Sequence, residues 1–249
     1  RYVMSEGQLS HSNALRSGPA LVGTLLRSLE VGPQIAAQRM ERRLVDDMVV
    51  AVDPDGKHLL LRFASGRVLH SHLGMNGRWR VQPAGTALSR GGLWLALRTA
   101  DHVVAQYRGP RLHLYEPGEA IMPTARVGPD LLDATQDPGQ SMVAALSRAT
   151  GGVTIGEALL DQRLIGGIGN VYRAEVLFLC AIDPWRAIEA ITADEAREIG
   201  QTASSLMRDG VTRPGPITSY HPPTPSRGER TWVYARAGRP CRRCATPIA

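Results

Sequence analysis

The sequence predicts an α+β protein, with an antiparallel β-sandwich or barrel in its N-terminal half and helices in its C-terminal half. Between about residues 43 and 114, short apolar runs alternate with Gly, Pro, Asp and Asn, a pattern typical of an antiparallel sandwich or barrel. From residue 141 to 207 the apolar residues recur at helical spacing instead. A chain of 249 residues can bury a core in one large domain or two smaller ones.

The N-terminal half begins with a predicted helix. Apolar residues that include Leu15, Leu21 and Leu25 predict it over about residues 14–29, with an interruption at Gly18-Pro19. Apolar runs then predict strands at residues 48–52, 59–63, 68–73, 92–97 and 102–105. We place this β-domain at residues 1–130.

The C-terminal half follows a predicted linker near residues 117–140. Helical spacing is found at residues 141–147, 155–163, 170–180 and 192–207, and Thr192 with Glu195 forms a capping-box pattern. Residues 210–229 are rich in Pro, Gly, Ser and Arg, which indicates a loop, and residues 231–234 predict a short strand. We expect a helical domain at residues 131–225 and a small module at residues 226–249.

Composition favours an anionic partner. The formal net charge is +6 and the pI is about 9.7, so nucleic acid is considered before a membrane. No apolar run approaches the length of a membrane span, and the start lacks a signal-peptide pattern. Three cysteines do not suggest a secreted disulfide scaffold, and Cys180 is interpreted as a buried thiol. We therefore expect a soluble cytoplasmic protein.

Lys57 is the only lysine among 29 basic residues. Lysine differs from arginine because its compact ammonium group can share or give up a proton. Lys57 lies in a turn before the predicted strand at 59–63, so it could be aimed into a cleft. An exposed surface lysine is the alternative interpretation.

The segment from Leu159 to Glu175 is the most specific in the chain. One predicted helix ends, three glycines follow within four positions, and a second helix opens at Asn170. Glycines permit a close backbone approach, and a helix start offers free N–H groups and a positive dipole end to a phosphate. A tightly packed helical hairpin without a ligand is the alternative.

This segment resembles the helix–two-turns–helix motif of the Fpg/Nei family of base-excision repair enzymes, the formamidopyrimidine-DNA glycosylases and endonucleases VIII. The resemblance extends over nearly the whole chain and is nearer to the endonuclease VIII branch. It includes the stretches at residues 4–7, 56–60, 71–77, 126–130 and 238–244. Their order and spacing together are far more specific than any one of them.

The resemblance implies a chemistry for three residues. The amine of Ser5, freed by removal of Met4, would attack the sugar C1′ of a flipped-out nucleotide and form a Schiff base. Glu6 would handle protons as the sugar opens and assist β-elimination. Lys57 would contact a phosphate beside the lesion and assist the chemistry.

The resemblance also implies the residues that hold DNA. Gly169 and Asn170 would bind backbone phosphate, and Met75 would fill the space left by the flipped base. Arg111, with His113 nearby, stands where some members place residues that face the opposite strand. A core methionine is the alternative interpretation of Met75.

The chain departs from the family at two N-terminal positions. The family's proline is Ser5 here, a primary amine with an ordinary pKa near 8 that can still form a Schiff base. The reaction requires Ser5 to carry a free amine, which residues 1–4 would block. Gln8 stands where an acidic residue is common in the family.

Cys241 and Cys244 resemble the opening of the family's zinc finger. A structural zinc site needs four ligands, and these two cysteines supply only two of them. The predicted zinc finger is therefore incomplete, and zinc is expected only with further ligands.

The leading hypothesis is a DNA glycosylase with AP-lyase activity that removes oxidised bases, mainly pyrimidines. A non-catalytic DNA-lesion or fork-binding protein with the same scaffold is the alternative, and a third is binding of structured RNA through the helical motif. We expect a bacterial, nucleoid-associated monomer whose partner is damaged DNA, with no membrane and no small-molecule cofactor.

Overall fold

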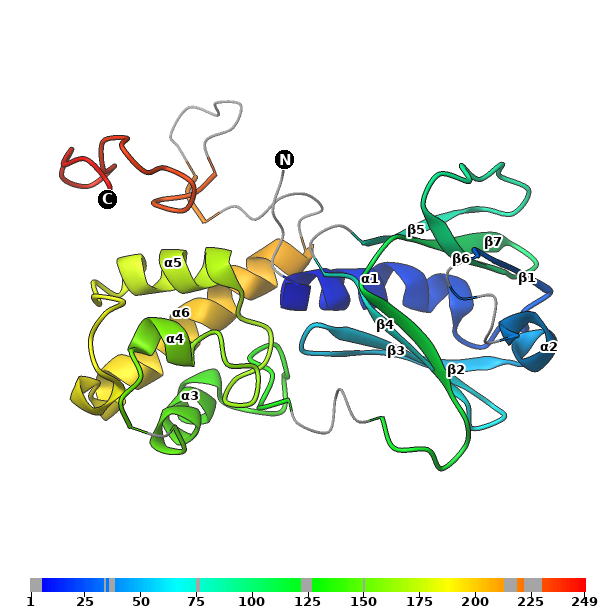
Figure 1. Ribbon diagram of the computed structural model, residues 1–249, viewed down its shortest axis with the longest axis horizontal. Coiled ribbons are helices and arrows are strands. Elements are labelled where there is room, and N and C mark those ends of the chain that lie inside the picture. The colour runs from blue at the N-terminus through cyan, green and yellow to red at the C-terminus, as the bar shows by residue number, and fades with distance from the viewer. Residues whose placement is uncertain are drawn as a thin grey trace. The chain divides into compact units, whose positions relative to one another are not determined.

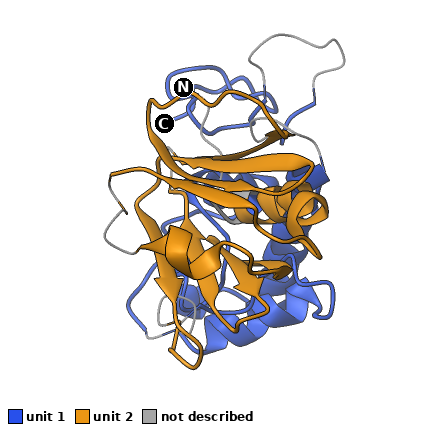
Figure 2. Ribbon diagram, turned by 90° about the vertical axis from the view of Figure 1, so that its right-hand side faces the viewer, with its two compact units in different colours: residues 1–8, 126–249 blue, residues 9–125 orange. Residues whose placement is uncertain are grey.

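The computed structural model describes residues 6–33, 35, 39–74, 77–121, 127–149, 151–212, 219–221 and 230–249. The chain forms two compact units, one of residues 9–125 and the other of residues 1–8 with 126–249 (Figure 2). Helix α1 (Glu6–Leu21) begins in the second of these and continues into the first. We call them the β unit and the helical unit.

The β unit contains two four-stranded antiparallel sheets (Figure 1). One has the order β1-β6-β7-β5, made of Ser28–Val31, Leu93–Arg98, His102–Tyr107 and Arg78–Pro83. The other has the order β2-β3-β4-β8, made of Val49–Asp55, His58–Phe63, Val68–His72 and Arg111–Tyr115. The predicted α+β class with antiparallel sheets is therefore confirmed.

One apolar core joins these elements. It contains Leu59, Leu61 and Leu69 of one sheet, and Leu95 and Leu97 of the other. Residues of α1 and of the short helix α2 (Met40–Leu44) pack into the same core. Along β3 and β4 the side chains alternate between this core and the opposite face of the sheet, and that opposite face carries His58, His70 and His72.

The predicted helix over residues 14–29 is wrong in its extent. Helix α1 ends at Leu21, where the hydroxyl of Thr24 donates to the Leu21 carbonyl. Leu25 then bridges Met48, and Ser28–Val31 pairs with β6. The apolar residues after the helix are therefore used for strand pairing. Strands β5 and β8 lie within the predicted β-rich stretch at about residues 43–114 but were not placed individually, and strand β1 and helix α2 were not predicted.

The helical unit contains α3 (Pro138–Ser147), α4 (Ile155–Ala158), α5 (Asn170–Leu179), the single turn η2 (Ile188–Ala190) and α6 (Ala193–Thr212). Its core includes Leu131, Met142, Ile155, Tyr172 and Ile199. In the described part of the chain, none of the helices is long and apolar enough to cross a membrane.

Two local predictions in the helical unit are corrected. Helix α3 starts three residues earlier than expected, because Asp137 caps it by accepting from the Gln140 N–H and Pro138 occupies the first turn. Residues 231–234 form no strand; they form bends and a turn. Their backbone N–H groups point to the carboxylate of Glu175, so they are not available for strand pairing.

Candidate nucleic-acid interface

The face of the β2-β3-β4-β8 sheet that turns away from the core gathers histidines from three strands. Cross-strand pairing places His58 opposite His72, and His72 opposite Arg111. The neighbouring row places His70 opposite His113. We call His58, His70, His72, His113 and Arg111 the histidine face. Its members are up to 55 positions apart in the sequence, and only strand register brings them together.

The two inner histidines form a hydrogen-bonded pair. His58 Nδ1 and His70 Nε2 are 2.8 Å apart, and His70 is fully buried. Burial, with the charges of His72 and Arg111, lowers the pKa of His58 to about 4; burial, with the charges of His58 and Arg111, lowers that of His70 to about 3. Both rings are therefore neutral near pH 7. The other ring nitrogen of His70 has no partner in the described structure, so we assign the shared proton to His70 Nε2, which leaves a lone pair rather than an N–H unpaired.

Lys57 lies in the turn between β2 and β3, next to His58. Its charge contributes to the lowered pKa of His58, as does that of Arg111. Because His58, His72 and Arg111 form one cross-strand row, Lys57 and Arg111 lie at the same end of the sheet. The loop at residues 73–77 leaves β4 at that end, so the sheet brings together two predicted site residues and the base of the predicted loop. Met75 itself lies outside the described residues.

A buried polar network fixes this end of the sheet. The Ser71 hydroxyl donates to Gln106 Oε1 at 2.8 Å and accepts from the Trp79 indole at 3.2 Å. Gln106 in turn donates to the Arg108 carbonyl at 3.0 Å. Gly109, at φ 122°, packs so closely that a Cβ atom there would lie 3.0 Å from the His72 carbonyl oxygen. This network was not predicted from the sequence, where its only signal was the presence of polar residues within apolar runs.

In the helical unit, Gln162 organises the glycine-rich link between α4 and α5. Its amide donates to the carbonyls of Leu160 (3.2 Å) and Ile168 (2.9 Å), and it accepts from the Gly167 N–H (3.0 Å). Helix α4 ends at Ala158, earlier than predicted, because the following residues turn around this side chain. Gly167 has a φ of 93°, a conformation that favours glycine.

The link ends at the start of α5. Gly169 is the N-cap in extended conformation and makes no side-chain cap, and Asn170 is the first helical residue. The first intrahelical bond runs from the Arg173 N–H to the Gly169 carbonyl at 2.9 Å. The N–H groups before Arg173 have no carbonyl partner within the helix, and Asn170 is exposed beside them. This arrangement can accept an anion such as a phosphate.

Of the predicted catalytic residues of the N-terminus, Glu6 falls in the same compact unit as Asn170. Ser5 lies outside the described residues. Glu6 is the first residue of α1, and residues 1–8 belong to the helical unit. Gln8, two residues after Glu6, accepts a hydrogen bond from Tyr172 of α5 at 2.5 Å.

The C-terminal module is anchored to α5 by one buried carboxylate. Glu175 is fully buried and accepts from the N–H groups of Trp232 (2.6 Å), Val233 (2.9 Å) and Tyr234 (2.8 Å), and from the Ser219 hydroxyl. These four donors replace the hydrogen bonds with water that the carboxylate oxygens lose on burial. Glu175 was not singled out from the sequence, because nothing local distinguishes it from an exposed helical glutamate.

Cys241 and Cys244 lie in a tight turn of this module. The Cys241 N–H donates to the Thr246 carbonyl at 2.7 Å, and the Arg243 N–H approaches Cys241 Sγ at 3.4 Å. Hydrogen bonding with Thr246 lowers the pKa of the Cys244 thiol. Within the described ranges, no group of three or more His, Cys, Asp or Glu side chains is placed to hold a metal ion. The described residues therefore do not form a complete zinc site by themselves.

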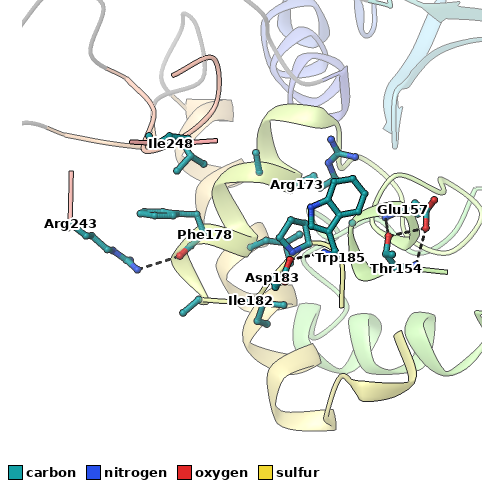
Figure 3. Close-up of a pocket in the computed structure, with 15 residues that line it drawn as sticks. Thr154, Glu157, Arg173, Phe178, Ile182, Asp183, Trp185, Arg243 and Ile248 are labelled. Carbon is teal, nitrogen blue, oxygen red and sulfur yellow. Dashed lines mark hydrogen bonds between the residues drawn. The ribbon is translucent and has the colours of Figure 1, made fainter. Parts of the chain in front are cut away.

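A groove of about 600 Å³ lies along the outer side of α5 (Figure 3). Leu177, Phe178 and Ile182 give it an apolar floor, and Trp185 stands at its edge with 79% of its surface exposed. Asn170 and Gly169 do not line it. Both carboxylates and guanidinium groups surround it, so its charge does not favour an ion of either sign.

The fold and these residues define a class of protein, the DNA glycosylases with an N-terminal β-domain and a helical C-terminal domain. Residues 14–114 match the N-terminal domain of formamidopyrimidine-DNA glycosylase, and residues 127–221 match the H2TH domain of that enzyme. The chain belongs to the Fpg/Nei family.

Named relatives agree with this assignment. The chain is 38% identical over 249 residues to Probable endonuclease 8 2 of Streptomyces coelicolor, covering 98% of this chain and 86% of that protein. It is 31% identical to the DNA-(apurinic or apyrimidinic site) lyase Nei2 of Mycolicibacterium smegmatis, covering 98% and 92%.

Solved structures share the fold. The MutM (Fpg) protein of Thermus thermophilus has a TM-score of 0.74 at 26% identity, covering 96% of this chain and 91% of that one. Lactococcus lactis Fpg in complex with DNA that contains N7-benzyl-Fapy-dG has a TM-score of 0.78 at 20% identity, with the same coverage.

Proposed function

We propose that the protein is a bifunctional DNA glycosylase and AP lyase that removes oxidised bases, mainly pyrimidines, from DNA. The observation that carries the proposal is the end of the β2-β3-β4-β8 sheet, where the only lysine of the chain, Arg111 and the base of the 73–77 loop meet. A shared fold alone does not establish an activity. This convergence of cationic groups is suited to a DNA backbone at a reacting nucleotide.

The proposed reaction uses the amine of Ser5 as nucleophile. Its nitrogen attacks C1′ of the flipped nucleotide, the C1′–base bond breaks, and the base leaves with a proton. Loss of the amine proton and opening of the sugar at O4′ give the Schiff base, with Glu6 as the group that supplies the proton to O4′. Removal of a C2′ proton then expels the 3′ phosphate by β-elimination, and water hydrolyses the Schiff base.

The helical unit and the β unit supply the binding groups of this proposal. Asn170 and the free N–H groups at the start of α5 would hold one backbone phosphate. Lys57 and Arg111 would hold the backbone near the lesion, and Met75 would fill the space of the flipped base. Each phosphate that a cationic side chain neutralises releases condensed counterions, so several such contacts give a binding constant that falls steeply with salt.

A lesion-binding protein without catalysis is the second candidate. The presence of Ser5 in place of the family's proline favours it, because proline is a secondary amine already shaped for an iminium. The two candidates share the DNA-binding surface and differ only in whether a covalent intermediate forms.

Borohydride trapping on DNA with an abasic site separates the two candidates. The sample is a preparation in which mass and N-terminal sequencing show Ser5 at the N-terminus. We expect a covalent protein–DNA adduct, and we expect Glu6→Gln to slow turnover by about 10²-fold or more while DNA affinity changes little. A free Ser5 amine that binds lesion DNA but gives no adduct on abasic or oxidised-base substrates supports the binding protein instead.

We propose, separately, that Cys241 and Cys244 hold zinc only where two further ligands complete the tetrahedral site. Two thiolates are half of the four ligands that a structural zinc site needs. Metal analysis of the 249-residue chain should show no stoichiometric zinc that resists a chelator. Retained stoichiometric zinc in a monomeric sample contradicts this proposal.

A further inference from the structure

Gln8 is a buried polar side chain with both ends of its amide hydrogen-bonded. It is 0% exposed. Its Nε2 donates to the Gly210 carbonyl of α6 at 2.6 Å, and its Oε1 accepts from the Tyr172 phenol of α5 at 2.5 Å. Tyr172 is also fully buried, and burial raises the pKa of its phenol. We call Gln8, Tyr172 and Gly210 the N-terminal latch.

The latch depends on the absence of a side chain at Gly210. A Cβ atom built there would lie 2.5 Å from both Cδ and Nε2 of Gln8. The backbone of Gly210 is ordinary helix, since α6 runs from Ala193 to Thr212 and Gly210 has no positive φ. Glycine destabilises a helix by about 1 kcal/mol relative to alanine. The glycine therefore makes room for Gln8 and meets no requirement of the backbone.

The N-terminal latch connects the segment that carries the proposed nucleophile to the helix that carries the proposed phosphate ligand. Tyr172 is two residues after Asn170, the proposed phosphate ligand, and Gln8 is three residues after Ser5, the proposed nucleophile. Three residues span at most about 11 Å. Anchoring Gln8 to Tyr172 therefore limits how far the N-terminal amine can stray from the start of α5.

We propose that Gln8 is a positioning residue for the N-terminal amine, an inference that rests on the proposed glycosylase and lyase function. Its amide holds the first turn of α1 against α5 and α6, so that the amine is presented to a nucleotide whose phosphate is bound at Asn170. Restricting a nucleophile in this way raises the rate of attack without adding a contact to DNA.

An ionised carboxylate at position 8 could accept from Tyr172 but could not donate to the Gly210 carbonyl. Glutamine satisfies both partners. A protonated glutamate side chain has the same shape and can also do so. The titratable groups that face this position in the described structure are Tyr172 of α5 and Asp209 of α6, whose charge also raises the pKa of Tyr172. The charge of Asp209 disfavours a second negative charge there, whereas the Tyr172 phenol, which is neutral, only donates a hydrogen bond.

The test measures the rate of borohydride-trapped adduct formation and, separately, the Kd for the same abasic DNA. For Gln8→Leu we expect adduct formation at saturating DNA to slow by about tenfold to a hundredfold, with Kd changed less than about threefold. Gly210→Ala should have the same effect in spite of its better helix propensity. Gln8→Leu and Tyr172→Phe should combine to much less than the product of their separate effects, because both break one latch.

Gln8→Glu supplies a readout that a purely structural role would not change. Its adduct rate relative to wild type should rise as the pH falls, because protonation of the introduced carboxylate restores the donor to Gly210. Gly18→Ala is the matched control, since a Cβ atom at this α1 glycine meets nothing within 4 Å. It should form adduct at the wild-type rate.

Three outcomes overturn the proposal or its basis. If Gln8→Leu and Gly210→Ala fold and trap at the wild-type rate, Gln8 does not position the amine. If Gln8→Leu weakens DNA binding and trapping in equal proportion, Gln8 supports the DNA surface instead. If wild-type protein with a free Ser5 forms no adduct, the proposed function itself fails, which is a distinct result.

Discussion

The histidine face of the β unit and the Gln162 link of the helical unit are polar arrangements built in opposite ways. The link uses nearby residues: the side chain of Gln162 contacts groups that are at most six positions away. The histidine face joins residues of three strands, and Arg111 reaches His72 only through the pairing of β8 with β4. A local arrangement depends on one side chain and its backbone, whereas a cross-strand arrangement depends on the register of the whole sheet.

Lys57→Arg tests whether the cationic end of the β2-β3-β4-β8 sheet, next to the histidine face, takes part in chemistry. Of the variants in this comparison, it has the largest expected effect. The substitution keeps the positive charge at the end of the sheet but replaces a compact ammonium with a planar guanidinium. We expect turnover on an oxidised-base duplex to fall by about 10²-fold, with binding changed little. The control is Arg62→Lys, because Arg62 lies farther along β3 and pairs with Asp53. Wild-type turnover in Lys57→Arg means that charge alone matters at this position.

Gln162→Ala tests the local arrangement. It removes three hydrogen bonds of the link, each with a net contribution of about 0.5–1.5 kcal/mol, so the free energy of unfolding should fall by about 2–3 kcal/mol. Denaturant titration measures this change. Gln136→Ala removes two hydrogen bonds that are both solvent-exposed, one to Asp133 and one from Ser141, and should cost much less. Equal losses in the two variants contradict the assigned role of Gln162.

The neutral His58–His70 pair predicts a pH dependence that the helical link lacks. The pKa values in the folded state, about 4 for His58 and about 3 for His70, lie below the ordinary 6.5. Below about pH 6.5 the unfolded state therefore binds more protons than the folded state. The contribution of the pair to the free energy of unfolding should be fully present above about pH 6.5 and should decline as the pH falls toward 4. The window from about pH 6.5 to 5 is the clearest, because ordinary carboxylates titrate below it.

His70→Leu should flatten part of this decline, and His102→Gln, a histidine outside the histidine face, should leave it unchanged. The measurement is the free energy of unfolding at several pH values. A slope that is the same in wild type and His70→Leu shows that the pair is not buried in neutral form.

The smallest expected effects are on DNA binding, and they distinguish a cationic contact in the β unit, Arg111, from a neutral contact in the helical unit, Asn170. Arg111→Ala should reduce the slope of log K against log salt by about 1, because one phosphate contact by a cation is lost. Asn170→Ala should weaken DNA binding by about 1 kcal/mol with the slope unchanged, because a neutral donor displaces no counterion. The measurement is the dissociation constant at several salt concentrations. Identical slopes in the two variants would contradict the assignment of Arg111 as a cationic phosphate contact and Asn170 as a neutral one.

Local pattern determined several features of this protein. The strands at 58–63 and 68–72 and the helices at 170–179 and 193–212 lie close to where apolar spacing placed them. The glycine-rich stretch before Asn170 indicated the turn and the helix start, and Lys57 was conspicuous as the only lysine. These features depend on residues close together in the sequence, where turn chemistry and periodicity act directly.

Only the tertiary structure decided what the distant polar residues do. Gln8 and Tyr172 are 164 positions apart, and the four donors that justify burying Glu175 come from residues 44 to 59 positions away. In the sequence, Gln8 was only a departure from a family pattern, and Glu175 was only the last residue of the glycine-rich segment, with no role assigned to it. A polar side chain is stable in a core only where its partners meet it, and packing alone determines where those partners are.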